Sequence, residues 1–206
     1  MGRPRTNDGA VKERLLEAAT EMFATRPRES VTIRAVAAAA GASTAAVYTL
    51  FDSKDVLINE VRNRAVAGLS RDLSAVPVTD DPLADLYALA VAYRRWGREH
   101  SHLYTVLFGG VQRFDPSGEM SAGDPVRPLV DTIGRALSAS VLVGEVTPIA
   151  LSLWVTLHGL VALELAGALD ATTAEAIFPS TILATLRGWA TPSQIDVPGS
   201  SPGPAP

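Results

Sequence analysis

Apolar residues recur three and four positions apart over most of the chain, which is the spacing of an amphipathic α-helix. In the first such segment they are Val11, Leu15, Ala18, Ala19, Met22 and Phe23, and the pattern stops near Arg26-Pro27. No segment shows the convincing alternation of apolar and polar residues that is typical of a half-buried strand. The pattern therefore predicts an all-α fold.

Capping residues divide the remaining chain into further helices. Thr32 and Ser43 are good N-caps and predict helices that run to Gly41 and to about Phe51. A further helix is predicted to start after Ser53 and to run to about Val76. A short apolar helix is expected within residues 101–110. Later starts are predicted at Asp81-Pro82, Asp124-Pro125 and Thr147-Pro148, and at a capping box from Thr172 to Glu175. The tail, residues 191–206, has too few apolar residues to form a core and is expected to be disordered.

Two of these helices, joined at Gly41, have the pattern of a helix-turn-helix. In the first, one face carries Ile33, Val36, Ala37 and Ala40, while Arg34 and Ala38 point away from it. In the second, one face carries Ala46, Val47 and Leu50, and the other carries Thr44, Ala45, Tyr48 and Thr49. Small exposed residues let a helix backbone approach base edges closely. We expect the second helix to enter a major groove of DNA.

Charge is distributed unevenly along the chain. The formal net charge is -4, yet residues 1–64 hold ten Lys or Arg against eight Asp or Glu, and residues 65–206 hold eight against fourteen. A basic segment can face phosphate groups, whereas an acidic one cannot. The asymmetry therefore favours an N-terminal half that binds nucleic acid.

The sequence resembles the TetR (tetracycline repressor) family of transcriptional regulators. The resemblance rests on "LLEAATEMF", "VTIRAVAAAAGAS" and "VYTLFDSKDVL", and "WVTLHGLVALELAG" is similar to the Trp and His-Gly signature of one branch. It implies a homodimer with a DNA-binding domain at 9–66 and an effector-binding and dimerisation domain at 67–190. The absence of cysteine fits a cytoplasmic location. Such a protein would be a repressor that a small, largely apolar effector releases from a palindromic operator in double-stranded DNA.

The resemblance also implies roles for single residues. Thr32, Tyr48 and Lys54 would contact phosphate, Arg34 a guanine edge, and Ser43, Thr44 and Ala45 the DNA backbone and bases. Thr49 is a further polar group on the reading face. Leu50 stands where many relatives have a histidine or tyrosine, and we interpret it as core. Arg34 could instead be a solvated residue, Tyr48 a half-buried core aromatic and Lys54 incidental. The N-terminal "GRPR" is either an arm that enters a minor groove or a flexible terminus.

The later apolar helix carries two stripes. Trp154 and His158 lie on one stripe, which we expect to face the interior, and the small residues Gly159, Ala162 and Ala166 lie on the other, which we expect to form a dimer interface. Effector contacts are predicted for Tyr93, Trp96, Tyr104, Phe108, Trp154 and His158. His158 is otherwise a core histidine, and the other aromatics are otherwise plain core. A metal site at His158 is not favoured, because no second ligand stands at a suitable spacing.

Other classes of function lack support in the sequence. The chain has no cysteine, no glycine-rich phosphate loop and no paired carboxylates in a motif, so we expect no enzyme activity, metal or cofactor. The uncharged stretch at 146–163 reaches the lower length of a membrane span. Pro148 and His158 favour a helix buried in protein instead, and no membrane partner is expected. The alternative is a helical membrane-associated or adaptor protein without DNA binding.

Overall fold

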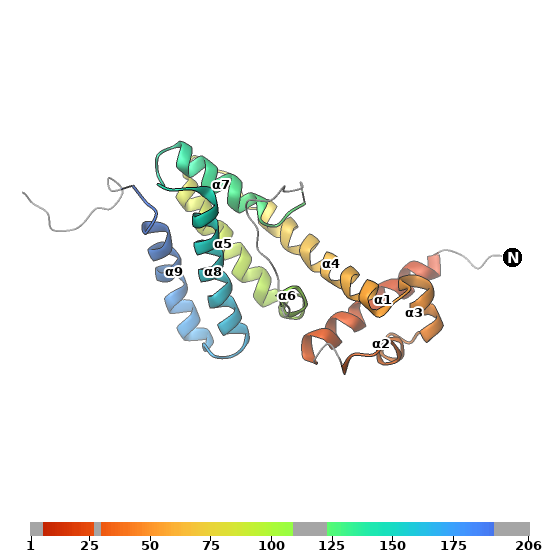
Figure 1. The fold of residues 1–206 in the computed structure, drawn as a ribbon. Helices are drawn as coiled ribbons and strands as arrows, with labels where there is room; N and C mark the ends of the chain where they lie inside the picture. Colours follow the sequence, from red (N-terminus) through yellow and green to blue (C-terminus); the bar gives the residue numbers. More distant parts are fainter. Residues whose placement is uncertain (1–5, 27–29, 109–122, 192–206) are drawn as a thin grey trace, which may run out of the picture. The chain divides into compact units, whose positions relative to one another are not determined.

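A computed structural model describes residues 6–26, 30–108 and 123–191 of the chain (Figure 1). These residues form nine α-helices and one isolated β-bridge, which confirms the all-α prediction. The helices are α1 (Thr6–Thr25), α2 (Ile33–Ala39), α3 (Thr44–Phe51), α4 (Lys54–Ser74), α5 (Pro82–Glu99), α6 (Ser101–Phe108), α7 (Arg127–Ser138), α8 (Val146–Leu165) and α9 (Ala171–Arg187). The predicted arm at 2–5, the stretch from 109 to 122 and the tail from 192 onward lie outside the described residues.

The described chain divides into two compact units. Unit 1 contains residues 6–74, 93–108 and 123–125, and unit 2 contains residues 75–92 and 126–191. Helix α5 contributes its first half to unit 2 and its second half to unit 1. The functional boundaries predicted from the sequence, 9–66 and 67–190, stay a prediction.

Unit 1 is built around α1, which packs against α2, α3, α4 and α6. The fully buried side chains of its core are large and apolar, and they include Leu15, Val36, Val47, Phe51 and Leu57. Helix α6 belongs to this core, because Val106 is buried in it and Leu103 packs against it. Burial of such side chains removes apolar surface from water, which is the main driving force for this arrangement.

The predicted N-caps of the first half of the chain are confirmed. Thr32 Oγ1 accepts a hydrogen bond from the Ala35 N–H at 3.2 Å, and Ser43 Oγ accepts one from Ala46 at 3.1 Å. Ser53 caps α4 in the same way, through the Val56 N–H at 3.2 Å. Each cap satisfies one of the N–H groups that a helix start leaves without a partner. These bonds fix where α2, α3 and α4 begin.

Three predicted starts in the second half are wrong. Helix α7 begins at Arg127 after Val126, so Asp124-Pro125 does not open it. Helix α8 begins at Val146, and Thr147-Pro148 lies inside its first turn. Helix α9 is capped by Asp170, whose carboxylate accepts from the Thr173 N–H at 2.9 Å, so Thr172 is a helical residue rather than a cap. Asp is as good a cap as Thr, and Asp170 stands immediately before the helix.

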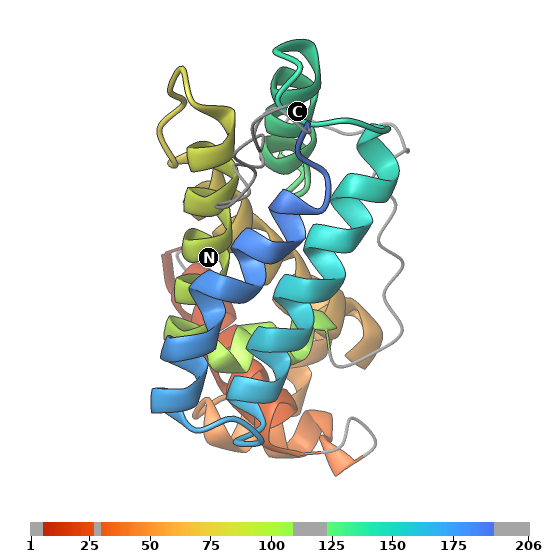
Figure 2. The same ribbon diagram turned by 90° about the vertical axis from the view of Figure 1, so that its left-hand side faces the viewer.

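Unit 2 packs α8 against both α7 and α9, and α8 and α9 lie side by side (Figure 2). The segment after α9 closes this unit. The Val143 N–H donates to the Trp189 carbonyl at 2.8 Å, the Thr191 N–H donates to the Val141 carbonyl at 3.1 Å, and Trp189 Nε1 donates to Ser152 Oγ at 2.8 Å. Gly144 has φ +119°, and a Cβ there would lie 3.2 Å from the Trp189 ring. A side chain at this position would therefore be strained and crowded.

An ion pair between a buried carboxylate and a partly exposed guanidinium joins the start of α5 to α7 within unit 2. Arg135 Nη2 donates to Asp85 Oδ2 at 2.6 Å, and Thr79 donates to the same carboxylate through its hydroxyl at 2.7 Å and its N–H at 3.0 Å. Asp85 is 3% exposed. Burial alone would raise the pKa of Asp85, but the hydrogen bonds from Arg135 and Thr79 bring that pKa below 3.8. The carboxylate is therefore charged at neutral pH.

The first prediction concerns this pair. Arg135→Met should lower the free energy of unfolding by about 1.5–3 kcal/mol, because a buried carboxylate loses a charged hydrogen-bond donor. The Arg135 side chain is 36% exposed, which places the value toward the lower end. Denaturant unfolding measures the loss. Arg127→Met is the matched control, since the Arg127–Asp131 pair is exposed and should contribute less than about 1 kcal/mol. Equal losses in the two variants would contradict the prediction.

Helix α8 is long and apolar enough to cross a membrane by length and composition, with a mean hydropathy of 1.7. The bent pair of α2 and α3 passes the same test when it is taken as one broken span. In α2 and α3, however, Val36, Ala37 and Val47 are part of the core of unit 1. Only 22% of the apolar window of α8 is buried in the described chain, so α8 is not the buried helix that Pro148 and His158 predicted. One or two helices that pass this criterion are weak evidence for a membrane role.

Candidate DNA-binding surface and effector-contact residues

The turn between α2 and α3 is a Schellman motif. The Ala42 N–H donates to the Ala37 carbonyl at 2.8 Å, and the Gly41 N–H donates to the Ala38 carbonyl at 3.2 Å. Gly41 has φ +63°, in the left-handed region that glycine adopts without strain. The motif ends α2 sharply and allows Ser43 to cap α3 two residues later. A rigid turn of this kind fixes how α3 leaves α2.

The outward face of α3 consists of the side chains predicted to read DNA. Thr44, Ala45 and Thr49 are exposed, as is Ser43 before them, and Tyr48 is 54% exposed. Val47 and Phe51 are buried on the opposite face, and Leu50 packs against the core, which confirms its interpretation as core. Thr32 and Arg34, at the start of α2, are also exposed. The predicted reading residues of α2 and α3 therefore present small side chains, hydroxyls, a phenol and the Arg34 guanidinium to solvent.

Hydrogen bonds decide what each hydroxyl on this face can offer. The capping oxygens of Thr32 and Ser43 accept from backbone N–H groups, so each keeps its O–H donor for a phosphate oxygen. Thr49 differs, because its hydroxyl donates to the Ala45 carbonyl at 2.8 Å. Thr49 can then present only an acceptor or its methyl group to DNA. The sequence does not reveal this difference.

Lys54 lies at the first turn of α4, with its Nζ 5.9 Å from the centre of the Phe23 ring. Its side chain is half-buried rather than fully solvated. Cation–π contact of this kind restricts where an ammonium group can lie. Lys12, the other lysine of the chain, is placed similarly over Phe51 at 5.5 Å and pairs with Glu60 at 3.6 Å. Both lysines thus also stabilise unit 1.

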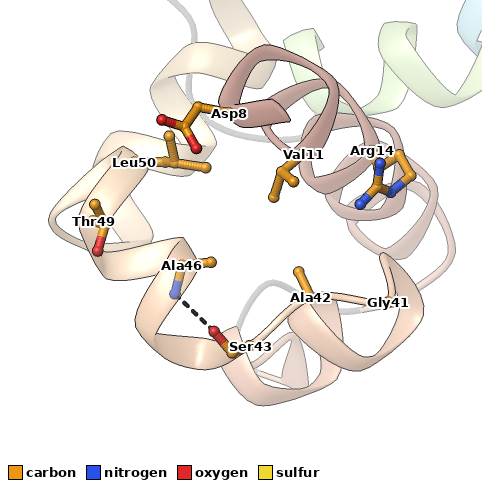
Figure 3. A pocket seen from close by; sticks show the side chains of 9 residues that line it. All are labelled: Asp8, Val11, Arg14, Gly41, Ala42, Ser43, Ala46, Thr49 and Leu50. Carbon is orange, nitrogen blue, oxygen red and sulfur yellow. Dashed lines mark hydrogen bonds between the residues drawn. The ribbon is translucent and has the colours of Figure 1, made fainter. Parts of the chain in front are cut away.

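A hollow of about 270 Å³ lies beside α3, on the side of α1 (Figure 3). Asp8, Val11 and Arg14 of α1 border it on one side, and Ala46, Thr49 and Leu50 of α3 border it on the other. The turn residues Gly41, Ala42 and Ser43 close a third side. Sequence reasoning did not single out Arg14, because its partner is distant in the chain.

The predicted effector-contact residues of unit 1 pack as an aromatic cluster. The ring centres of Tyr93 and Tyr104 are 6.1 Å apart in an edge-on arrangement, and those of Tyr104 and Phe108 are 4.7 Å apart. The Tyr93 hydroxyl donates to the Tyr104 hydroxyl at 3.5 Å. Burial raises the pKa of both phenols, that of Tyr104 to about 12. Trp96 is 1% exposed, and its ring centre lies 5.5 Å from that of His100 at an interplanar angle of 51°. These side chains form core in this state, and their contact with an effector stays a prediction.

The predicted residues of unit 2 form a stacked pair on α8. The Trp154 and His158 ring centres are 5.1 Å apart with an interplanar angle of 12°. Both side chains are partly buried, and burial lowers the pKa of His158 from its usual 6.5. The imidazole is therefore neutral at physiological pH. Within the part of the chain that the structure describes, no group of three His, Asp or Glu side chains is placed to hold a metal ion.

This lowered pKa yields a second prediction. The unfolded chain binds a proton at His158 more tightly than the folded chain does. The stability that the neutral His158 contributes is therefore fully present above pH 6.5 and is lost as pH falls toward the folded pKa. The melting temperature of the wild type should therefore fall more between pH 7.5 and pH 5.5 than that of His158→Gln. Thermal unfolding at a series of pH values measures this difference. Parallel curves for the two proteins would show that His158 is not buried as described.

The predicted dimer stripe lies on a face of α8 that unit 2 leaves open. An ideal Cβ on Gly159 would meet no atom within 4 Å, and Ala166 is exposed. Large apolar side chains border the stripe: Val155 is 60% exposed and Leu163 is 48% exposed. Leu183 on α9 is 38% exposed. Val155 and Leu163 stand four positions before and after Gly159 and so share its face of the helix, and exposed apolar side chains on one face indicate a candidate interaction surface.

Two segments of the chain match known protein families. Residues 15–61 match the family described as "Bacterial regulatory proteins, tetR family", and residues 86–185 match the "Tetracyclin repressor-like, C-terminal domain". The chain belongs to the TetR family. It is a DNA-binding transcriptional regulator, and a membrane or adaptor protein without DNA binding is not favoured. The branch with the Trp and His-Gly signature stays a prediction.

Individual relatives of this TetR-family protein match most of its chain. A helix-turn-helix-type transcriptional regulator of Mycobacterium tuberculosis is 27% identical over 91% of this chain and 89% of its own. The TetR-family regulator PfmR of Thermus thermophilus has a TM-score of 0.67 at 20% identity, over 84% of this chain and 97% of its own. SmeT in complex with triclosan has a TM-score of 0.64 at 20% identity, over 96% of this chain and 99% of its own. Both solved structures share the fold.

Proposed function

We propose that the protein is a homodimeric repressor that binds a palindromic operator through α3 and leaves it when a small, largely apolar effector binds. The observation that carries the proposal is the outward face of α3, where exposed small and hydroxyl side chains lie opposite the buried Val47 and Phe51. A recognition helix needs such a face, because bulky residues would hold its backbone away from base edges.

The proposed contacts follow from the chemistry of each exposed group. Arg34 matches the two acceptors on the major-groove edge of guanine, and Ala45 can contact a thymine methyl group. The hydroxyls of Thr32 and Ser43, the Tyr48 phenol and the Lys54 ammonium suit phosphate oxygens, while Thr44 can reach either. Phosphate contacts position the protein and base contacts specify the sequence. We assign sequence preference chiefly to Arg34.

The apolar face of α8 and α9 supports a homodimer. Gly159, Ala162 and Ala166 allow a helix of a second copy to approach closely, and the exposed Val155 and Leu163 would be buried by it. A two-fold axis through this face relates two reading helices, as a palindromic operator requires. Burial of the apolar face of α8 by a second copy would account for the high hydropathy of this helix without a membrane. We therefore place the protein in the cytoplasm.

The Trp154–His158 pair supports an apolar effector site in unit 2. The stacked rings offer an apolar surface, and the neutral imidazole offers one hydrogen-bond donor or acceptor. SmeT, which shares the fold, was solved with triclosan, a small and largely apolar molecule. We assign effector contacts to Trp154 and His158 first. The aromatic cluster of unit 1 is the second candidate, and no enzymatic step or cofactor is part of the proposal.

The test combines operator mapping with effector release. DNA just upstream of the protein's own gene is footprinted and its affinity compared with that of a scrambled sequence of equal length. A protected palindrome is expected, and equal affinity for both sequences would overturn the proposal.

Triclosan is then added as the first apolar probe, followed by other small hydrophobic molecules. Trp154→Ala should keep operator affinity and respond less to any probe that releases the wild type. Loss of operator binding in the folded variant, with release unchanged, would contradict the assignment.

A further inference from the structure

Arg14 links α1 to the turn that precedes the reading helix. Its Nε donates to the Ala40 carbonyl at 3.2 Å across 26 positions of sequence, and its Nη1 donates to the Ala10 carbonyl at 3.4 Å. We propose that Arg14 is a positioning residue for DNA reading: it holds the carboxyl end of α2 and thereby fixes the start of α3. The proposal rests on the proposed DNA binding by α3.

The backbone bonds that end α2 do not use the Ala40 carbonyl, which accepts from Arg14. The Schellman bonds use the carbonyls of Ala37 and Ala38, and the Ala40 carbonyl follows them at the C-cap. Ala40 is 7% exposed, so a lost hydrogen bond at this position would be costly. A guanidinium group also suits the negative end of the helix dipole. Arg14 thus completes the cap of α2 from another helix.

The hollow beside α3 gives this single bond its importance. Ala46 and Thr49 border open space on the flank that faces α1, while Arg14 lies at the end of the same space near Gly41 (Figure 3). The opposite face of α3 is held in the core by Val47 and Phe51, whereas this flank borders the hollow. The turn from Gly41 to Ser43 sets where α3 begins, and Arg14 supports that turn. Loss of this support should let α3 pivot about its first residues.

Arg14 has a competing role, which the experiment separates. An arginine beside a recognition helix could contact a DNA phosphate directly. Two of its three guanidinium nitrogens are, however, directed to backbone carbonyls of unit 1. Removing a residue that contacts phosphate lowers the slope of affinity against salt by about one counterion. Removing a positioning residue leaves that slope unchanged. Salt dependence is therefore a readout that distinguishes the two roles.

The variants follow from the geometry. Arg14→Gln keeps an N–H donor at the place of Nε, because both nitrogens are the fourth atom of the side chain, and Arg14→Met keeps the length without a donor. Arg64→Met is the control: it also removes one positive charge, and it breaks the exposed ion pair of Arg64 with Glu13 between α1 and α4. Arg64 lies about 15 Å along α4 from Lys54. Operator and scrambled DNA are titrated at a series of salt concentrations.

Arg14→Met should bind the operator about ten-fold more weakly, the equivalent of one lost hydrogen bond, with the salt slope of the wild type. Arg14→Gln should recover most of this loss, and Arg64→Met should bind like the wild type. Wild-type affinity in Arg14→Met would overturn the proposal, as would a shallower salt slope without recovery by glutamine. If Arg14→Met does not fold, Arg14→Lys decides. Lysine keeps the charge but displaces the donor, so weaker binding at unchanged slope is expected and wild-type affinity would overturn the proposal. Failure of the wild type itself to prefer the operator would instead reject the proposed function.

Discussion

Replacing Arg34 with alanine is expected to weaken operator binding by about 1–3 kcal/mol per half-site and to abolish the preference at one base pair in each half-site. Arg34 is exposed at the start of α2, close to the Thr32 cap. It is the only cation among the predicted base-reading residues, and the exposed face of α3 offers only hydroxyls and a phenol beside it. Competition binding against operators that carry each single base change measures both effects.

Lys54→Met is the informative comparison for Arg34→Ala. It should weaken operator and scrambled DNA alike and lower the salt slope by about one per lost contact, because a phosphate contact reads no sequence. Methionine is preferable to alanine here, since its side chain can still pack on the Phe23 ring that Lys54 covers. If Lys54→Met changed the preferred sequence while Arg34→Ala weakened all DNA equally, the assigned roles would be reversed.

Gly159→Leu is expected to convert the dimer to monomer over the micromolar range. An ideal Cβ on Gly159 has no neighbour within 4 Å, so a side chain can start there without a clash in its own chain, and a leucine would project toward the proposed second copy. Overpacking costs about 1–3 kcal/mol, and two-fold symmetry places the substitution twice in the interface. The dimer should therefore lose about 2–6 kcal/mol. Light scattering across a dilution series measures the change, and operator affinity should fall with it.

Gly134→Leu is the matched control for this substitution. Gly134 is also inside a helix, α7, and also has nothing within 4 Å of an ideal Cβ. Both variants replace a helical glycine, which should stabilise each folded chain slightly, by roughly 1 kcal/mol or less. Only Gly159→Leu should dissociate. An unchanged dimer for Gly159→Leu would place the interface on another face. Dissociation of both variants would show that the effect is not specific to the α8 interface.

Local sequence signals predicted the first half of the fold well. Thr32, Ser43 and Ser53 each precede a predicted helix, and each caps that helix. The spacing of Val36, Ala37 and Val47 also indicated which faces of α2 and α3 are buried. At these positions local preference and tertiary packing agree, so the sequence alone was sufficient.

Elsewhere several local signals compete or act at a distance. Asp170, Thr172 and Thr173 are all suitable caps, and the choice of Asp170 depends on where the preceding turn at Gly167, with φ +71°, leaves the chain. Helical periodicity places Thr49 on the reading face but cannot show that its hydroxyl donates to the Ala45 carbonyl, since that depends on its rotamer. The contact of Arg14 with Ala40 joins two helices and has no local pattern.

The closure of unit 2 by the segment after α9 determines where the chain can be shortened or extended. A protein that ends at Gly188 would lose the Trp189 ring beside Gly144 and the carbonyl that accepts from the Val143 N–H. It would also leave the Ser152 hydroxyl without the indole donor. A protein that ends after Thr191 keeps all of these contacts. An affinity tag or fluorescent reporter for the binding experiments therefore belongs after Thr191, at the carboxyl end.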